Sequence, residues 1–217
     1  MASSMIHIAV ASEINKRINR DKSKLFIGTI APDISKLIGQ TKVGTHFLDN
    51  DATDLPNLGR FLAKYAGNLN DDFVLGYYIH LYTDYLWFKY FIPEIYNEDK
   101  HLITKLDGSI FECHGKMLSQ YIYNDYTNLN INLIDDYDLD LKIFYNEIPD
   151  MDNIIEEIPM DRLNLIVNKT AEIIENTRVK KDLVFNMEDI HKFIKYSSDI
   201  IISDIENRNI FDNIVKK

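Results

Sequence analysis

The stretch "DDFVLGYYIHLYTDYLWFKY", residues 71–90, constrains the fold of this chain more than any other. It is apolar nearly all the way round, which indicates a helix buried at the centre of a mostly helical protein. Within this helix His80 and Asp84 are four residues apart, so they share one face and could coordinate one metal ion together. An imidazole and an ionised carboxylate are costly to bury without partners, so this face predicts a polar site inside the core.

Helical signals also dominate the rest of the chain, and its few Gly and Pro residues fall mostly at expected helix boundaries. Further helices are expected at Ser4–Asn19, from Leu55 through Tyr65, at Asn97–Tyr123, at Arg162–Thr177 and at Met187–Asn207. The apolar segment "KLFIGTIAPDISKL" should break at Gly28 and Pro32, and "TKVGTHFLDNDATDLP" should form an irregular connection. Residues 124–152 are expected to be a long, loosely structured connection with short β-prone pieces. With no internal repeat or clear boundary, we predict one all-α, multi-helix domain over residues 1–217.

Composition narrows the classes of function. The formal net charge of −10 disfavours a general nucleic-acid binder, but it is compatible with a metal-neutralised pocket that accepts a phosphate. A single cysteine, Cys113, excludes an internal disulfide. The first residues do not read as a signal peptide, and no apolar run approaches the roughly 18 residues of a membrane span. A cytoplasmic location without an integral membrane segment is therefore expected.

Three more residues join His80 and Asp84 as candidates for the polar site: His7, Asp33 in "IAPD" and His46 in "THF". Each has an ordinary structural explanation when it is taken alone. The HxxxD pair could be an ion pair within a helix, His7 a satisfied core histidine, Asp33 a turn or capping residue, and His46 a surface histidine. Together they supply the imidazole and carboxylate ligands that Zn²⁺ uses, so the combination favours a metal site.

The order and local context of these residues resemble the zinc-dependent phospholipase C family, whose helical fold is shared with the single-strand-specific zinc nucleases. The matching segments are the first helix with His7, "GTIAPD" ending at Asp33, "THF" at His46, and "GYYIHLYTDYLW" with His80 and Asp84. More particularly, the chain is similar to a compact intracellular branch of uncharacterised hydrolases. The resemblance covers residues 4–110 and continues beyond them only as a helical pattern.

The resemblance implies a zinc ion held by Asp33, His46, His80 and Asp84, with a possible second ion between His7 and Asp84. Two carboxylates and two neutral imidazoles make the first Zn²⁺ site, ion and ligands together, formally neutral. Asp33 and Asp107 are the carboxylates expected to act in catalysis. Asp107, in "ITKLDGSIF", matches an acidic residue that the compact branch carries after the HxxxD helix, but it could equally cap the turn before Gly108.

The chain departs from the family at its remaining metal ligands, which include the Glu of a second HxxxE motif. No such motif exists here, because His101 is followed four residues later by Lys105, His114 by Leu118 and His191 by Lys195. A complete three-metal centre is therefore not expected.

We predict a metal-dependent hydrolase, with zinc as its metal and metal-activated water as the nucleophile, that acts on a phosphoester or phosphodiester. Its partner would be a small-molecule or lipid phosphoester, and the negative charge favours a water-soluble one. The alternative is a non-catalytic helical module in which the same ligands hold a single structural metal, because structural sites are closed and four-coordinate. The sequence does not indicate an oligomeric state.

Overall fold

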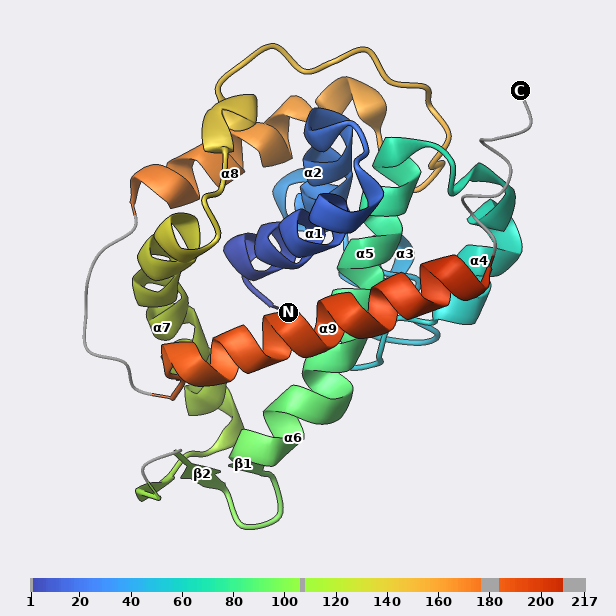
Figure 1. Cartoon of the computed structure of the whole chain (residues 1–217). Helices are drawn as coiled ribbons and strands as arrows, with labels where there is room; N and C mark the ends of the chain where they lie inside the picture. Colours follow the sequence, from blue (N-terminus) through green and yellow to red (C-terminus); the bar gives the residue numbers. More distant parts are fainter. Residues whose placement is uncertain (1, 106–107, 177–183, 209–217) are drawn as a thin grey trace.

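The computed structural model describes residues 2–105, 108–176 and 184–208 (Figure 1). Helices contain 67% of the residues and strands 4%, so the predicted all-α, multi-helix class is confirmed. The α-helices are α1 (Ser4–Ile18), α2 (Lys22–Ile30), α3 (Lys42–Thr45), α4 (Leu58–Tyr65), α5 (Asp72–Leu86), α6 (Ile92–Ile95), α7 (Gly115–Asp136), α8 (Asn164–Glu175) and α9 (Met187–Asn207). Short 3₁₀ segments are η1 (Ala31–Ile38), η2 (Ala66–Asn68), η4 (Leu141–Phe144) and η5 (Met160–Arg162).

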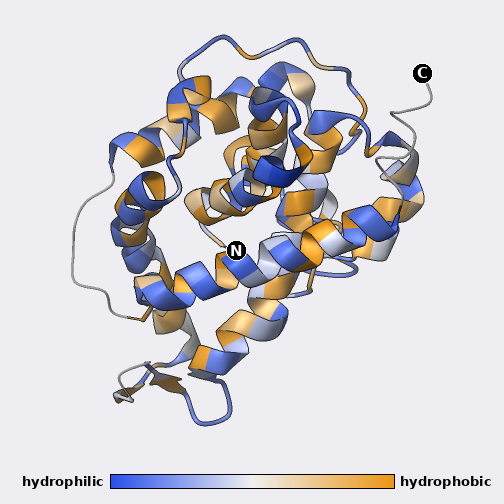
Figure 2. Cartoon of the chain, in the orientation of Figure 1, coloured by the Kyte–Doolittle hydropathy of each residue, from blue (hydrophilic) through white to orange (hydrophobic). Residues whose placement is uncertain are grey.

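Helix α5 lies at the centre, as the sequence predicts, with α1, α2, α4 and α9 packed around it (Figure 1). The Asp71 side chain caps it by accepting a hydrogen bond from the Val74 N–H at 3.0 Å. Twelve of its fifteen residues are buried, including both His80 and Asp84. Figure 2 shows helices α7, α8 and α9, with mixed polar and apolar residues, around the more hydrophobic α2 and α5. A helix surrounded on all sides explains why its sequence is apolar nearly all round.

Helices α2 and α5 approach each other so closely that only glycine fits at two positions. A Cβ on Gly28 would come within 2.1 Å of the Phe73 carbonyl oxygen, and a Cβ on Gly76 within 2.1 Å of the Leu25 carbonyl oxygen. The two contacts are reciprocal, each glycine facing the backbone of the other helix. This approach brings the backbone at the end of α2 against the face of α5 that carries His80.

The expectation of a helix over Asn97–Tyr123 is wrong in its first half. Instead, a three-stranded antiparallel sheet is formed by β1 (Tyr96–Asn97), β2 (Leu102–Thr104) and β3 (Ile110–Glu112), in the order β1-β2-β3. Strand β2 buries Ile103 completely, in register with Phe111. Strands of two or three residues are too short to show a repeating pattern of apolar and polar residues, so the sequence did not indicate them.

Residues 124–152 are also more ordered than expected, because α7 runs through their first part to Asp136. Its buried side chains Tyr126, Leu129 and Leu133 recur at helical spacing beneath a surface rich in Asn and Asp. Polar composition alone therefore concealed an amphipathic helix. The expected connection begins only after Asp136 and includes the single turn η4.

A π-helical segment, η3 (Trp87–Phe91), links α5 to α6 without a break. It begins three residues after Asp84, so His80 and Asp84 lie in the last regular turns of the central helix.

Among the helices of the described residues, none is both long and apolar enough to cross a membrane.

Candidate metal centre

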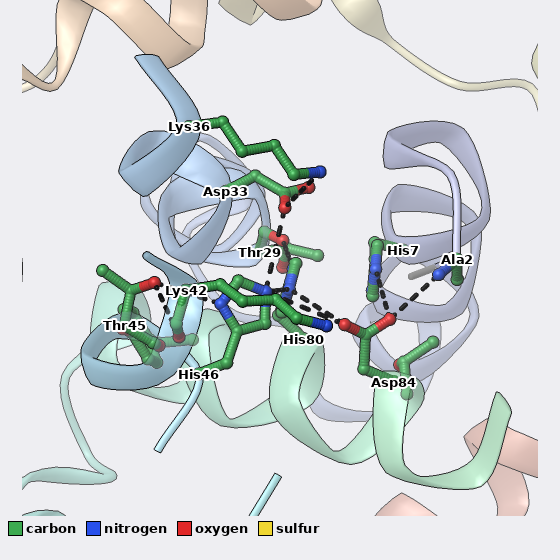
Figure 3. Close-up of polar contacts among 12 residues, drawn as sticks. Ala2, His7, Thr29, Asp33, Lys36, Lys42, Thr45, His46, His80 and Asp84 are labelled. Carbon is green, nitrogen blue, oxygen red and sulfur yellow. Dashed lines mark hydrogen bonds and ion pairs between the residues drawn. The ribbon is translucent and has the colours of Figure 1, made fainter. Parts of the chain in front are cut away.

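Five polar side chains from four parts of the chain meet beside α5 (Figure 3). They comprise one residue of α1, one of η1, one that follows α3 and two of α5, namely His7, Asp33, His46, His80 and Asp84. Four of them are at most 1% exposed, while the side chain of Asp33 remains 14% exposed. The structure thus brings together all five residues of the predicted metal set, which we call the centre. Asp107, the other expected catalytic residue, lies outside the described residues.

The centre consists of two overlapping groups of possible ligands. One contains His7, His80 and Asp84, and the other contains Asp33, His46 and His80. Within each group the ligand atoms lie within 4.8 Å of one another. Both groups include His80, so they surround neighbouring positions and could bind a metal ion.

The backbone of α2 fixes the tautomer of His80. Its Nδ1 lies 2.7 Å from the carbonyl oxygen of Thr29, and a carbonyl can only accept, so we assign the ring proton to Nδ1. The Nε2 lone pair then points into the centre, 3.3 Å from Nε2 of His46 and 3.7 Å from Oδ2 of Asp84. A histidine whose other nitrogen donates to a carbonyl is the usual arrangement of a metal ligand.

His46 has a similar second partner. Its Nδ1 lies 3.0 Å from the hydroxyl of Thr45, which also reaches the Lys42 carbonyl oxygen at 3.5 Å. If the hydroxyl donates to that carbonyl, it accepts from Nδ1–H of His46, and the Nε2 lone pairs of His46 and His80 face each other. A cation satisfies this arrangement. Without one, His46 must carry its proton on Nε2 and donate it to His80.

Several buried polar atoms of the centre have no hydrogen-bond partner among the described residues. They are both ring nitrogens of His7 and Oδ1 of Asp33. Nε2 of His7 lies 3.3 Å from Oδ1 of Asp84, but the angles of this contact do not meet those of a hydrogen bond. Buried polar atoms are nearly always paired, so these atoms fit a bound cation better than an empty cluster.

The two oxygens of Asp84 face different neighbours. Oδ1 accepts a hydrogen bond from the backbone N–H of Ala2 at 2.9 Å and faces His7. Oδ2 faces His80 and His46, at 3.7 and 3.8 Å. The carboxylate is therefore positioned between the two ligand groups, and the Ala2 amide holds its orientation.

The protonation states of the centre suit a cation. Burial lowers the pKa of His80 to about 3, and the nearby His7 acts in the same direction. Burial also lowers the pKa of His46 to about 4. Burial alone would raise the pKa of Asp33 and Asp84, but the neighbouring imidazoles, and Lys36 beside Asp33, outweigh it and lower both. At neutral pH, His46 and His80 are thus neutral and the carboxylates ionised, the forms that bind metal.

Sequence reasoning missed Lys42, which is half-buried on α3. Its ammonium group interacts electrostatically with the carboxylate of Asp84, with which Figure 3 draws it, and lies 5.8 Å from the centroid of the Phe88 ring. Burial lowers the pKa of Lys42. The spacing of four residues from His46 on a short helix is the only signal that could have indicated it. The backbone groups of Thr29 and Ala2 left no signal at all.

The other histidines form separate contacts. The rings of His101 and His114 lie 4.8 Å apart beside the small sheet, and His191 pairs with Asp136 at 3.1 Å. These contacts connect the sheet with the start of α7, and the end of α7 with α9. We assign them no part in the centre.

The chain matches no protein-family model, no curated protein and no solved structure. The resemblance to the zinc-dependent phospholipase C family therefore stays a prediction from the motif residues, and the function has to be argued from the geometry of the centre.

Proposed function

We propose that this protein is a metal-dependent hydrolase of phosphoesters, with Zn²⁺ as its ion and water as the nucleophile. The clustering of three buried imidazoles and two carboxylates around two neighbouring positions that share His80 supports this proposal most strongly. The carboxylates supply the two negative charges that neutralise a divalent cation, and mixed nitrogen and oxygen ligands suit zinc.

The fixed tautomer of His80 favours one principal ion. Because Nδ1 is engaged by Thr29, His80 can offer only Nε2, and both ligand groups need it. We place this ion among His46, His80, Asp33 and Asp84. His7, on the other oxygen of Asp84, would complete the same site or hold a second, weaker ion.

A bound Zn²⁺ would lower the pKa of a water molecule and neutralise charge on a phosphoryl group. Residues of the chain would hold the reacting groups in place. Lys42 brings a positive charge beside Asp84, where it could stabilise charge developing on a phosphoryl oxygen. The lowered pKa of Asp33 makes this carboxylate a poor proton acceptor at neutral pH, so we assign it to ion binding.

Metal content and hydrolysis, measured on the same samples, test the proposal. The purified protein should contain at least one zinc ion per chain and hydrolyse bis(4-nitrophenyl) phosphate or 4-nitrophenyl phosphate. His80→Ala and Asp84→Ala should lose both the metal and the activity. His191→Ala changes a half-exposed histidine outside the centre and should lose neither.

Two results would contradict the hydrolase. Zinc bound at one ion per chain, with no hydrolysis of either ester and unfolding on chelation, would establish the structural module instead. Protein without zinc, whose melting temperature does not respond to added zinc, would leave the centre as a metal-free polar network in which His46 donates to His80.

A further inference from the structure

A cavity of about 280 Å³ opens beside the centre. It lies between the residues that begin α1, the segment η1, and helices α7 and α8. Asp33 forms part of its wall, and so does Ala2, whose N–H holds Asp84. A larger hollow of about 590 Å³ under residues 147–163 shares no residue with the centre. A phosphoester bound at the centre would therefore place its organic part in the smaller cavity, which we call the side cavity.

The walls of the side cavity are mainly apolar and aromatic. Ile166 and Tyr126 are buried in its wall, while Tyr123 is 54% exposed at its edge. A volume of about 280 Å³ falls just below the ~300–1,000 Å³ of most small-molecule sites. It is enough for one compact ring or branched group but too small for the long acyl chains of a phospholipid.

Two lysines give the side cavity a charge preference. Lys36 comes from η1 and Lys169 from α8, and both border the cavity. Lys36 lies 3.6 Å from Oδ1 of Asp33, and Lys169 lies 2.8 Å from a carboxylate oxygen of Glu172. Both lysine side chains are about half exposed, so these ion pairs are weak and an incoming anion can replace them. Two cations at one cavity in a chain of net charge −10 favour a negatively charged occupant.

We propose that the side cavity binds the organic part of a small, soluble phosphoester that carries one compact apolar or aromatic group and a second negative charge. Lys36 and Lys169 would bind that second charge, while the centre holds the reacting phosphoryl group. This inference rests on the proposed hydrolase function, and it selects a small substrate over a lipid. The second charge could be a carboxylate or another phosphate, because both are anions that lysine binds.

Binding of non-reacting probes tests the side cavity separately from hydrolysis. The probes are 2-naphthoate, 2-naphthyl phosphonate and the neutral 2-naphthamide, titrated into the zinc-loaded protein. At least one of the two anions should bind ten or more times more tightly than the amide, and the stronger one identifies the preferred charge. Lys36→Gln and Lys169→Gln should each weaken anion binding at least fivefold. Lys195→Gln, a change to an exposed lysine on α9, should not.

The Asp84→Ala variant distinguishes the side cavity from the metal as the site that holds the probe. Binding that persists in this variant and still depends on Lys169 supports the proposal. If binding is lost in Asp84→Ala and is unaffected by either lysine substitution, the anion binds the metal, and the proposed role of the side cavity is overturned. Equal affinity for the acids and the amide also overturns it.

Kinetics then separate failure of the side cavity from failure of the hydrolase. We expect 3-carboxy-4-nitrophenyl phosphate to have a KM at least fivefold below that of 4-nitrophenyl phosphate, with Lys169→Gln removing the difference. Hydrolysis without this preference contradicts the side cavity alone. Lysine-dependent binding of naphthoate without hydrolysis of any ester contradicts the proposed function alone.

Discussion

Thr29 contributes no side chain to the centre, yet its carbonyl oxygen decides which nitrogen of His80 is free. The hydroxyl of Thr45 lies 3.0 Å from Nδ1 of His46, and the N–H of Ala2 donates a hydrogen bond to Asp84. The five residues of the centre were predictable from the HxxxD pair in an apolar helix together with the order of motifs that resembles the zinc-dependent phospholipase C family, which also singled out His46 in a polar stretch. Their supporting groups were not, because a backbone carbonyl or amide has no sequence signature and meets its partner only in the fold.

Thr45→Val should weaken zinc binding about tenfold, because it removes the hydroxyl that orients His46 while keeping a side chain of similar shape. The measurement is a competition titration with a chromophoric chelator. Thr104→Val changes an exposed residue of β2 and serves as the control. Equal affinity of Thr45→Val and the control would show that this hydroxyl does not position a ligand.

Lys42→Met should lower kcat for bis(4-nitrophenyl) phosphate by about 10- to 100-fold, a loss typical for removal of a group that stabilises transition-state charge. Zinc content should stay unchanged, since Lys42 is not a ligand, and Lys42→Arg should restore part of the activity. Lys192→Met, on the exposed face of α9, is the matched control. An unchanged kcat, or a loss of zinc that parallels the loss of rate, would contradict this role.

Among the elements, the contact between α2 and α5 positions the centre. Long helices with strong periodicity were predictable, and α9 begins and ends at the residues expected. The small sheet and the part of α7 beyond Tyr123 were not, since short strands and a helix covered with Asn and Asp carry weak local signals. The closeness of α2 and α5 was equally hidden, because Gly28 looked like a helix breaker rather than a contact residue.

Gly76→Ala should destabilise the protein by about 2 kcal/mol or more, because its Cβ would collide with the backbone of α2. Moving α2 away also separates Thr29 from His80, so zinc affinity should fall together with stability. Gly67→Ala is the control, since a Cβ there meets nothing within 4 Å. Urea unfolding and zinc titration of both variants check this, and equal stability would refute the close approach.

For the molecule as a whole, the buried ionisable groups of the centre predict sensitivity to acid. The ordinary histidine pKa is 6.5, against about 4 for His46 and about 3 for His80 in the fold. Between about pH 6.5 and pH 4 these two histidines are protonated in the unfolded chain but neutral in the fold. The unfolded chain therefore binds more protons, and the free energy of unfolding falls as pH falls. The lowered pKa values of Asp33 and Asp84 add to this loss below about pH 4.

We therefore expect the melting temperature of the zinc-free protein to decrease from pH 7 to pH 4. The double variant His46→Asn/His80→Asn should show a flatter dependence, because it lacks the two groups that take up protons on unfolding. Thermal melts followed by circular dichroism at a series of pH values measure both. A flat profile in the unmodified protein would contradict burial of neutral imidazoles.

All five residues of the centre belong to the first 84 residues, whereas the side cavity is completed by α7 and α8. In the proposed hydrolase, the reacting centre and the substrate-selecting cavity would therefore be encoded largely in separate stretches of one polypeptide. In the proposed hydrolase, substitutions confined to Tyr123, Ile166 and Lys169 would change the preferred ester while leaving the candidate metal ligands unaltered. A directed-evolution library limited to the cavity face of these two helices would explore new substrates while the chemistry stays constant.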